Sequence, residues 1–291
     1  MTSPFLMIMR KELKDSLQSK WLITFGVTFF FLALGVPYII LGAGGLLPGD
    51  YPGMVVGTLV TLAVPLVPLV SLAMSSTSIA GEREVGTMEY LLAQPSTKFE
   101  VFFGKYLGLV TALTLAMFLG YGGAELIVYS TNPEFIASFI YALVYSLMLA
   151  GASVGLGFIV SVSVKTRAAA IGTGLFLWFV LVVIYDSGFL GVITVALDAD
   201  SLLIPLTLAN PVETTRILAL MHMAESPLRG ELGPQAAYLL QNYGSITASR
   251  ILTGVLFLWV IVPVVISYLI FNRQDATISF SYNSLFEFLF K

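Results

Sequence analysis

The sequence predicts an all-α polytopic membrane protein in which six transmembrane helices form a single transmembrane domain over residues 1–291. Hydrophobic residues make up 57% of the chain and charged residues only 11%, whereas soluble domains carry about 25% charged residues. The mean hydropathy is +0.93. Six apolar stretches are each close to the roughly 20 residues that a helix needs to cross a bilayer. The absence of cysteine excludes a disulfide framework and a thiolate metal site.

Residues 1–20 predict an amphipathic cytoplasmic helix ahead of the first span. Apolar residues recur near helical spacing on one face and charged residues occupy the rest, as in a helix that lies at a membrane surface. These apolar residues are Leu6, Met9, Leu13 and Leu17. A signal peptide is the competing interpretation. Because the apolar stretch from Trp21 is longer than the hydrophobic part of a signal peptide, we expect the segment to be retained.

The six apolar stretches are the predicted spans. They cover residues 21–41, 54–74, 106–129, 135–164, 168–185 and 251–271. The fourth contains Gly151, Gly155 and Gly157, which form a small-residue face that lets another helix approach closely. We expect these glycines to serve helix packing in preference to contact with a substrate.

The segment 81–104, which we call the elbow, is a long charged stretch between the second and third predicted spans. Gly86 should interrupt a first short helix, and Thr87 should cap a second. Pro95 should end the second helix, and Ser96 should cap a third. We interpret the elbow as a coupling element that a partner grips on the water side. A solvated amphipathic loop is the alternative that composition leaves open.

The distribution of basic residues predicts the orientation in the cytoplasmic membrane. In a six-span model, 11 of the 14 lysines and arginines fall on one side, and only Arg216, Arg229 and Arg250 fall on the other. The excess marks the cytoplasmic side and places both termini and the elbow there. Residues 274–291 then form an aromatic-rich cytoplasmic tail, which we expect on the inner membrane surface.

An extracytoplasmic helical segment is predicted between the fifth and sixth spans, over residues 186–250. Asn210 is a suitable helix cap, Pro211 suits the first helical position, and Glu213 stands where a capping box places an acid. The two helices predicted in this segment cover residues 211–223 and 234–243. Together they would form an outer cap, which either closes the outer mouth or presents a docking surface.

Glu125 lies inside the third predicted span, near its outer end. An ionisable side chain at that depth is a functional hypothesis by default. Tyr121 and Tyr129 lie one turn to either side and favour a structural interpretation, in which they hydrogen-bond the carboxyl group. In the other structural interpretation the Glu125 side chain reaches the membrane interface.

Several classes of function lack their residues in this sequence. There is no GxxxxGK[ST] loop, so the chain cannot hydrolyse ATP through a P-loop. His222 is the single histidine, which excludes HExxH zinc chemistry, and the run Met221-His222-Met223 does not converge on one ion in a helix. No acids, histidines and nucleophiles converge near the spans. We therefore predict no catalytic residue, no metal site and no binding of nucleic acid, which disfavours a membrane-embedded enzyme.

The elbow carries the run Glu82-Arg83-Glu84-x-Gly86-Thr87-x-Glu89-x-Leu91-Leu92-x-x-Pro95, followed by Glu100. This run resembles the cytoplasmic loop between the second and third spans of ABC-2 type permeases. In that family the loop is a coupling helix that docks on a separate ATP-binding-cassette subunit. The resemblance therefore implies that the residues of this run contact an ATPase. It also implies that ATP and Mg bind that partner and that this chain holds no cofactor.

Three further stretches extend the resemblance over nearly the whole chain. They are Arg10-Lys11-Glu12-Leu13-x-Asp15, Asn210-Pro211-Val212-Glu213-x-x-Arg216 and Phe271-x-Arg273-x-Asp275. They resemble the ABC-2 permeases that serve maturation of the copper sites of nitrous oxide reductase. The resemblance implies a type V exporter-like fold and a homodimer, with two ATPase copies inside and a β-helical partner outside. That outer partner would contact Asn210, Pro211, Glu213 and Arg216. An ABC-2 exporter of a lipid, glycan or drug is the alternative.

Overall fold

The computed structural model describes residues 3–42, 51–92, 96–129, 136–189, 203–222 and 233–289, and these residues form helices without strands. The helices are α1 (Pro4–Leu17), α2 (Lys20–Gly42), α3 (Tyr51–Val85), α4 (Thr87–Leu92), α5 (Lys98–Tyr129), α6 (Ile136–Ser163), α7 (Arg167–Trp178), the π-helix η2 (Phe179–Phe189), α9 (Leu203–Leu208), α10 (Pro211–Met221) and α11 (Gly233–Leu289). The predicted all-α class is confirmed.

Five described helices are long and apolar enough to cross a membrane, and the count is six if α1 and α2 form one bent span. The two helices meet at an angle of 63°. Lys20–Gly42 coincides closely with the first predicted span, and α1 is the predicted amphipathic helix that precedes it. The predicted multi-pass membrane protein is therefore confirmed.

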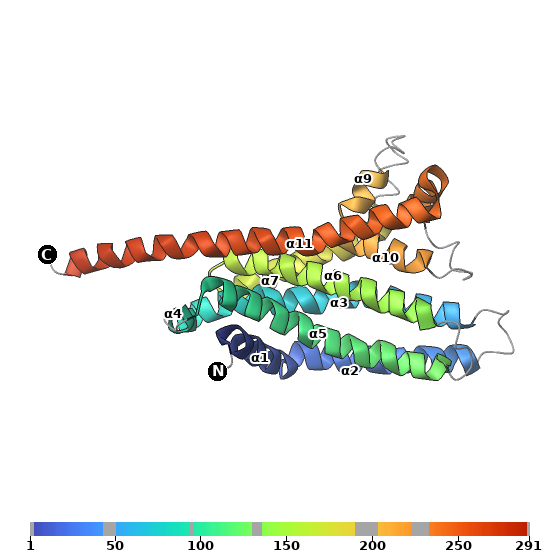
Figure 1. Cartoon of the computed structure of the whole chain (residues 1–291), viewed down its shortest axis with the longest axis horizontal. Coiled ribbons are helices and arrows are strands. Elements are labelled where there is room, and N and C mark those ends of the chain that lie inside the picture. Colours follow the sequence, from blue (N-terminus) through green and yellow to red (C-terminus); the bar gives the residue numbers. More distant parts are fainter. Residues whose placement is uncertain are drawn as a thin grey trace.

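The long helices pack side by side along the long axis of the molecule, as Figure 1 shows. The most extensive packing joins α3 to α6, and α3 also contacts α2, α7 and α10. The short helices α1 and α4 lie at one end of the bundle, and α9 and α10 lie towards the other (Figure 1). The bundle thus has an elbow end and a far end.

The glycines of the fourth predicted span serve helix packing, as predicted. A Cβ atom at Gly157 would overlap the Ser75 hydroxyl of α3, and one at Gly155 would lie 3.0 Å from Val264 of α11. Close approach brings the Ser161 hydroxyl to the backbone of α3, where it accepts hydrogen bonds from the Ile79 and Ala80 amides at 2.9 and 3.0 Å. These contacts fix α6 against α3 without space for added side-chain atoms.

The helix start predicted at Asn210 is confirmed. The Asn210 side chain accepts a hydrogen bond from the Val212 amide at 2.9 Å, and Pro211 occupies the first turn of α10. The helix packs against α3, α6 and α11, so it reaches in among the spans. The helix before it, α9, is held at the same level by the Trp259 indole, which lies within the sixth predicted span and donates to the Leu208 carbonyl at 3.0 Å.

The last helix, α11, contains a break at Gly244, where φ is 71° and ψ is 162°. Glycine suits this left-handed conformation because it has no Cβ atom. The segment before the break matches the helix predicted over 234–243. Beyond the sixth predicted span α11 continues to Leu289 and extends past the other helices (Figure 1). Residues 274–289, most of the predicted cytoplasmic tail, continue the helix of that span.

Candidate functional site

Three helices converge at the elbow end: α1, the end of α3 and the start of α5. The approach of α1 to α5 depends on two glycines of α5. A Cβ atom at Gly104 would lie 3.0 Å from Ile8, and one at Gly108 would lie 2.8 Å from both the Glu12 Cβ and the Met9 carbonyl. The bare backbone of α5 thereby brings Glu12 next to Lys105.

Lys105 is the centre of an ion cluster that joins all three helices. Its Nζ lies 2.9 Å from Glu12 Oε2 of α1 and 2.9 Å from Glu82 Oε1 of α3, and only 3% of its side chain is exposed. Lys11 of α1 lies 3.6 Å from the same Glu82 oxygen. The Ser78 hydroxyl donates to the second Glu12 oxygen at 3.0 Å. An ammonium group at this depth is stable only because carboxylates pair with it.

Residues 81–85, at the end of α3, form what we call the root of the elbow. Two further charged residues of this root also bind within the chain. Arg83 donates to the Val162 carbonyl at the end of α6 at 3.2 Å. The Glu84 carboxylate accepts a hydrogen bond from the Arg167 amide at 2.6 Å, at the start of α7. The root is thus attached to α6 and α7 as well as to α1 and α5. Direct contact of these side chains with an ATPase stays a prediction.

Aromatic rings extend the attachment from α5 to α6 and α11. Phe102 is fully buried, and its ring centroid lies 5.2 Å from that of Phe158 on α6. On α11, Tyr268 and Phe271 lie 5.4 and 5.8 Å from the same ring. Since such rings pack rigidly, a displacement of the start of α5 would pass to both helices.

The elbow itself differs in two details from its prediction. The segment 81–85 is the end of α3, so Gly86, at φ 77°, follows one long helix where a short one was predicted. The cap of α5 is Thr97, which corrects Ser96. Its hydroxyl accepts from the Glu100 amide at 3.2 Å, and Glu100 Oε2 accepts from the Thr97 amide at 2.8 Å, which is a capping box.

The remaining predicted elbow residues have mixed exposure. Thr87 is exposed and donates its hydroxyl to the Glu82 carbonyl at 3.2 Å, and Leu91 packs partly buried against the core. Pro95 lies outside the described residues, as do the side chains of Glu89 and Leu92. Val85, beside Gly86, is 76% exposed and is a large apolar side chain available to a partner.

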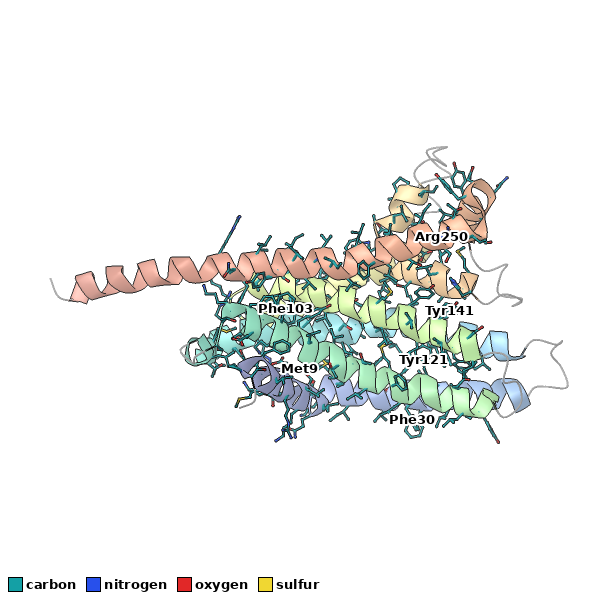
Figure 2. The ribbon with its side chains drawn as sticks, viewed as in Figure 1. Met9, Phe30, Phe103, Tyr121, Tyr141 and Arg250 are labelled. Atoms are coloured by element: carbon teal, nitrogen blue, oxygen red, sulfur yellow. The ribbon has the colours of Figure 1, made fainter. Side chains whose placement is uncertain are left out.

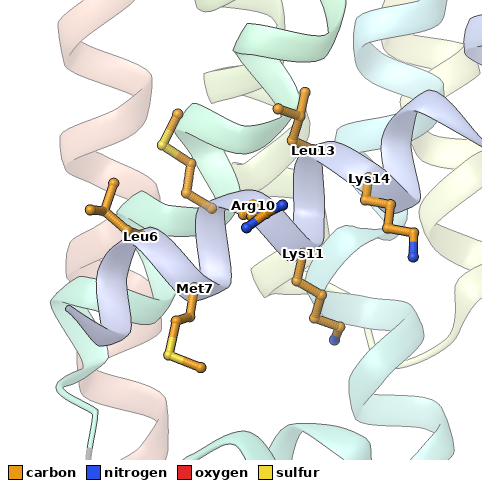
Figure 3. Close-up of a pocket in the computed structure, with 7 residues that line it drawn as sticks. Leu6, Met7, Arg10, Lys11, Leu13 and Lys14 are labelled. Atoms are coloured by element: carbon orange, nitrogen blue, oxygen red, sulfur yellow. The ribbon is translucent and has the colours of Figure 1, made fainter. Parts of the chain in front are cut away.

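The outward face of α1 carries a groove of about 770 Å³. Figure 3 shows Leu6, Met7, Arg10, Lys11, Leu13 and Lys14 along it; Met9 completes the lining. Three cationic side chains thus alternate with apolar ones. A surface of this kind suits a partner that is both acidic and apolar.

The predicted outer contact residues divide into two pairs. Asn210 has no exposed surface, its amide donates to the Leu181 carbonyl at 2.7 Å, and Pro211 is buried as well. These two residues hold α10 in place, and their contact with an outer partner stays a prediction. Glu213 and Arg216 are partly exposed and pair with each other at 3.4 Å.

Glu125 of α5 is partly buried, and one of its carboxylate oxygens has no hydrogen-bond partner among the described residues. Tyr121, predicted as a partner, instead shares a hydrogen bond of 2.9 Å with Ser146. The side chain of Tyr129 lies outside the described residues.

Comparisons with known proteins match nearly the whole chain. A family model described as ABC-2 family transporter protein matches residues 6–276. A protein of Pseudomonas aeruginosa named probable ABC transporter permease protein NosY is 30% identical over 220 residues, which cover 73% of this chain and 80% of that protein. A protein of Stutzerimonas stutzeri with the same name is 27% identical over 274 residues, which cover 92% and 97% respectively.

Proposed function

The chain belongs to the ABC-2 family of transporter proteins, and we propose that it is the permease subunit that transmits the motion of a separate ATPase across the membrane. The ATPase would bind ATP and Mg, and this chain would respond to its closure. The observation that carries the proposal is the Lys105 cluster, which ties α1 and the root of the elbow to a membrane helix.

The path of motion follows from these attachments. A force applied to α1 reaches α3 and α5 through Glu12, Lys105 and Glu82. A force applied to α4 enters α3 directly, because only Gly86 separates the two helices. From α5 it passes to α6 and α11 through Phe102. The elbow end would therefore move as one rigid unit and displace the helices of the bundle with it.

The narrower function we propose is that of the NosY permeases. Both relatives above carry that name, and the resemblance of the sequence extends from the first helix to the last. The complex would contain two copies of this chain, two ATPase copies and an extracytoplasmic β-helical protein of the NosD type. It would serve maturation of the copper sites of nitrous oxide reductase. Co-purification of a secreted β-helical protein from native membranes supports this role, and an ATPase as the only partner favours a general exporter.

Orientation can be tested because the chain has no cysteine, so that one added thiol is the only one present. We expect Tyr243→Cys, at the far end, to react with a membrane-impermeant maleimide in intact cells. Thr87→Cys, on the elbow, should react only after lysis. Both parent side chains are exposed, so burial does not confound the comparison. Labelling of position 87 in intact cells would place the elbow outside and contradict the proposal.

The groove on α1 can be tested by charge reversal. The double variant Arg10→Glu and Lys14→Glu should reduce the amount of ATPase that co-purifies about tenfold, because two negative charges would then repel an acidic partner. Both side chains are exposed, so the fold should be retained. Gln241→Glu, which adds a negative charge at an exposed position of the far end, is the control and should leave co-purification unchanged. Equal recovery of ATPase with the double variant would exclude this face as a docking surface.

A further inference from the structure

A pocket of about 360 Å³ lies at the far end, between the end of α10 and the part of α11 that follows the Gly244 break. It is lined by Met221, His222, Ser245, Ile246, Ser249 and Arg250. Figure 2 shows Arg250 on α11 at the same end of the bundle as Tyr141 on α6. The coupling role proposed above makes no use of this pocket.

His222 lines the pocket, and its ring is held in one orientation by its neighbours. Its Nδ1 lies 2.9 Å from the Leu218 carbonyl and therefore carries a proton, because a carbonyl only accepts. Its Nε2 lies 3.5 Å from the Ser249 hydroxyl. The ring packs against Tyr141 and Tyr145, with centroid distances of 4.4 and 5.4 Å. These contacts hold both ring nitrogens in place beside Arg250.

The lining groups are suited to an anion. Arg250 supplies a guanidinium that can donate two parallel hydrogen bonds to a phosphate, and Ser245 adds a hydroxyl donor. The Ser249 hydroxyl faces the unprotonated Nε2 of His222 and donates to it. Among the described residues that line the pocket there is no carboxylate to neutralise the arginine. Within this described lining, the formal charge is that of Arg250 and is positive.

An apolar stripe continues from the pocket along the same face of α11. Ile246 is 68% exposed, and Phe257, Ile261 and Val265 follow Arg250 at helical spacing and are exposed as well. Arg250 directly precedes the sixth predicted span, so the stripe begins where the membrane interior would begin. A cationic pocket above an exposed apolar stripe matches a phosphate headgroup above its acyl chains.

We propose that this pocket binds the phosphate of an anionic phospholipid in the leaflet at the far end, with an acyl chain along the exposed face of α11. The phosphate would contact Arg250 and Ser245. Exposed Tyr141 lies beside the pocket at the level where tyrosines favour the membrane interface. A free phosphate ion offers the same headgroup chemistry, and the apolar stripe is what favours the lipid.

Thermal unfolding and titration of the purified full-length chain in detergent test the proposal. Dioleoylphosphatidylglycerol should raise the unfolding temperature, whereas dioleoylglycerol, which has the same acyl chains without the phosphate, and inorganic phosphate should not. Arg250→Gln should weaken binding of the phospholipid about tenfold, because a charge-assisted hydrogen bond is lost. Ser245→Ala should weaken it less. Arg273→Gln, which removes the same charge at the other end of the sixth predicted span, should bind like the parent.

Three results would overturn the proposal. Equal stabilisation by dioleoylglycerol would show that the phosphate contributes nothing. Equal stabilisation by inorganic phosphate would assign the pocket to a soluble anion. Unchanged binding in both Arg250→Gln and Ser245→Ala would place the lipid elsewhere. The parent and these variants should unfold at similar temperatures without lipid, because the side chains of Arg250 and Ser245 are both exposed.

Discussion

Replacing Lys105 by methionine should destabilise the elbow end by about 3–5 kcal/mol and abolish stimulation of the partner ATPase. The methionine fills the space of the lysine stem, but it leaves the carboxylates of Glu12 and Glu82 in a site from which water is largely excluded. Their mutual repulsion should separate α1 from the root of the elbow. Thermal unfolding in detergent measures the stability, and ATP hydrolysis by the reconstituted complex measures the coupling.

Two further variants isolate the cause. Lys14→Met removes a lysine from the exposed side of the same helix α1 and should change the unfolding temperature little. Adding Glu12→Gln and Glu82→Gln to Lys105→Met removes the unpaired charges and should restore much of the stability. If Lys105→Met alone unfolds like the parent and still stimulates the ATPase, the ion cluster does not hold α1, α3 and α5 together.

Gly157→Ala should be the most damaging single-methyl addition among the glycines of α6. The added Cβ atom would overlap the Ser75 hydroxyl and lie 2.9 Å from the Ser75 Cβ and 3.1 Å from the Ser76 amide nitrogen. Because the last of these atoms belongs to the backbone, α3 and α6 must move apart. Overpacking of this kind costs about 1–3 kcal/mol. The loss should appear as a lower unfolding temperature and a lower yield of folded protein.

Gly172→Ala is the matched control for Gly157→Ala. A Cβ atom at Gly172 of α7 meets nothing within 4 Å, so alanine should be tolerated there and should stabilise the helix by about 1 kcal/mol. Adding Ser75→Gly to Gly157→Ala removes the clashing side chain and should recover part of the loss. Similar behaviour of the two alanine variants would contradict the close packing of α3 against α6.

Features of the fold that depend on local chemistry could be predicted from the sequence. The start of α10 was predicted because Asn210 and Pro211 act on the backbone beside them. The cap of α5 was missed by one residue, since Ser96 and Thr97 are adjacent hydroxyls. Glu100, three residues after Thr97, was the signal that could have identified the capping box.

Features that depend on tertiary contacts could not be predicted in this way. Glu12 and Lys105 are 93 residues apart, and the sequence shows only an acid in an amphipathic helix and a lysine directly before an apolar span. The closeness of α1 to α5 depends on Gly108, whose role emerges only when the two helices are placed together. The burial of Asn210 likewise depends on its contact with the Leu181 carbonyl.

Cross-linking from the elbow tests the central claim most directly. A photoactivatable reagent attached to Thr87→Cys in native membranes, followed by affinity purification and mass spectrometry, identifies what touches the elbow. We expect an ATP-binding-cassette ATPase to be cross-linked from position 87 and not from Tyr243→Cys at the far end. If position 87 captures no ATPase while the complex is intact, the elbow is not the site at which ATP-driven motion enters this protein.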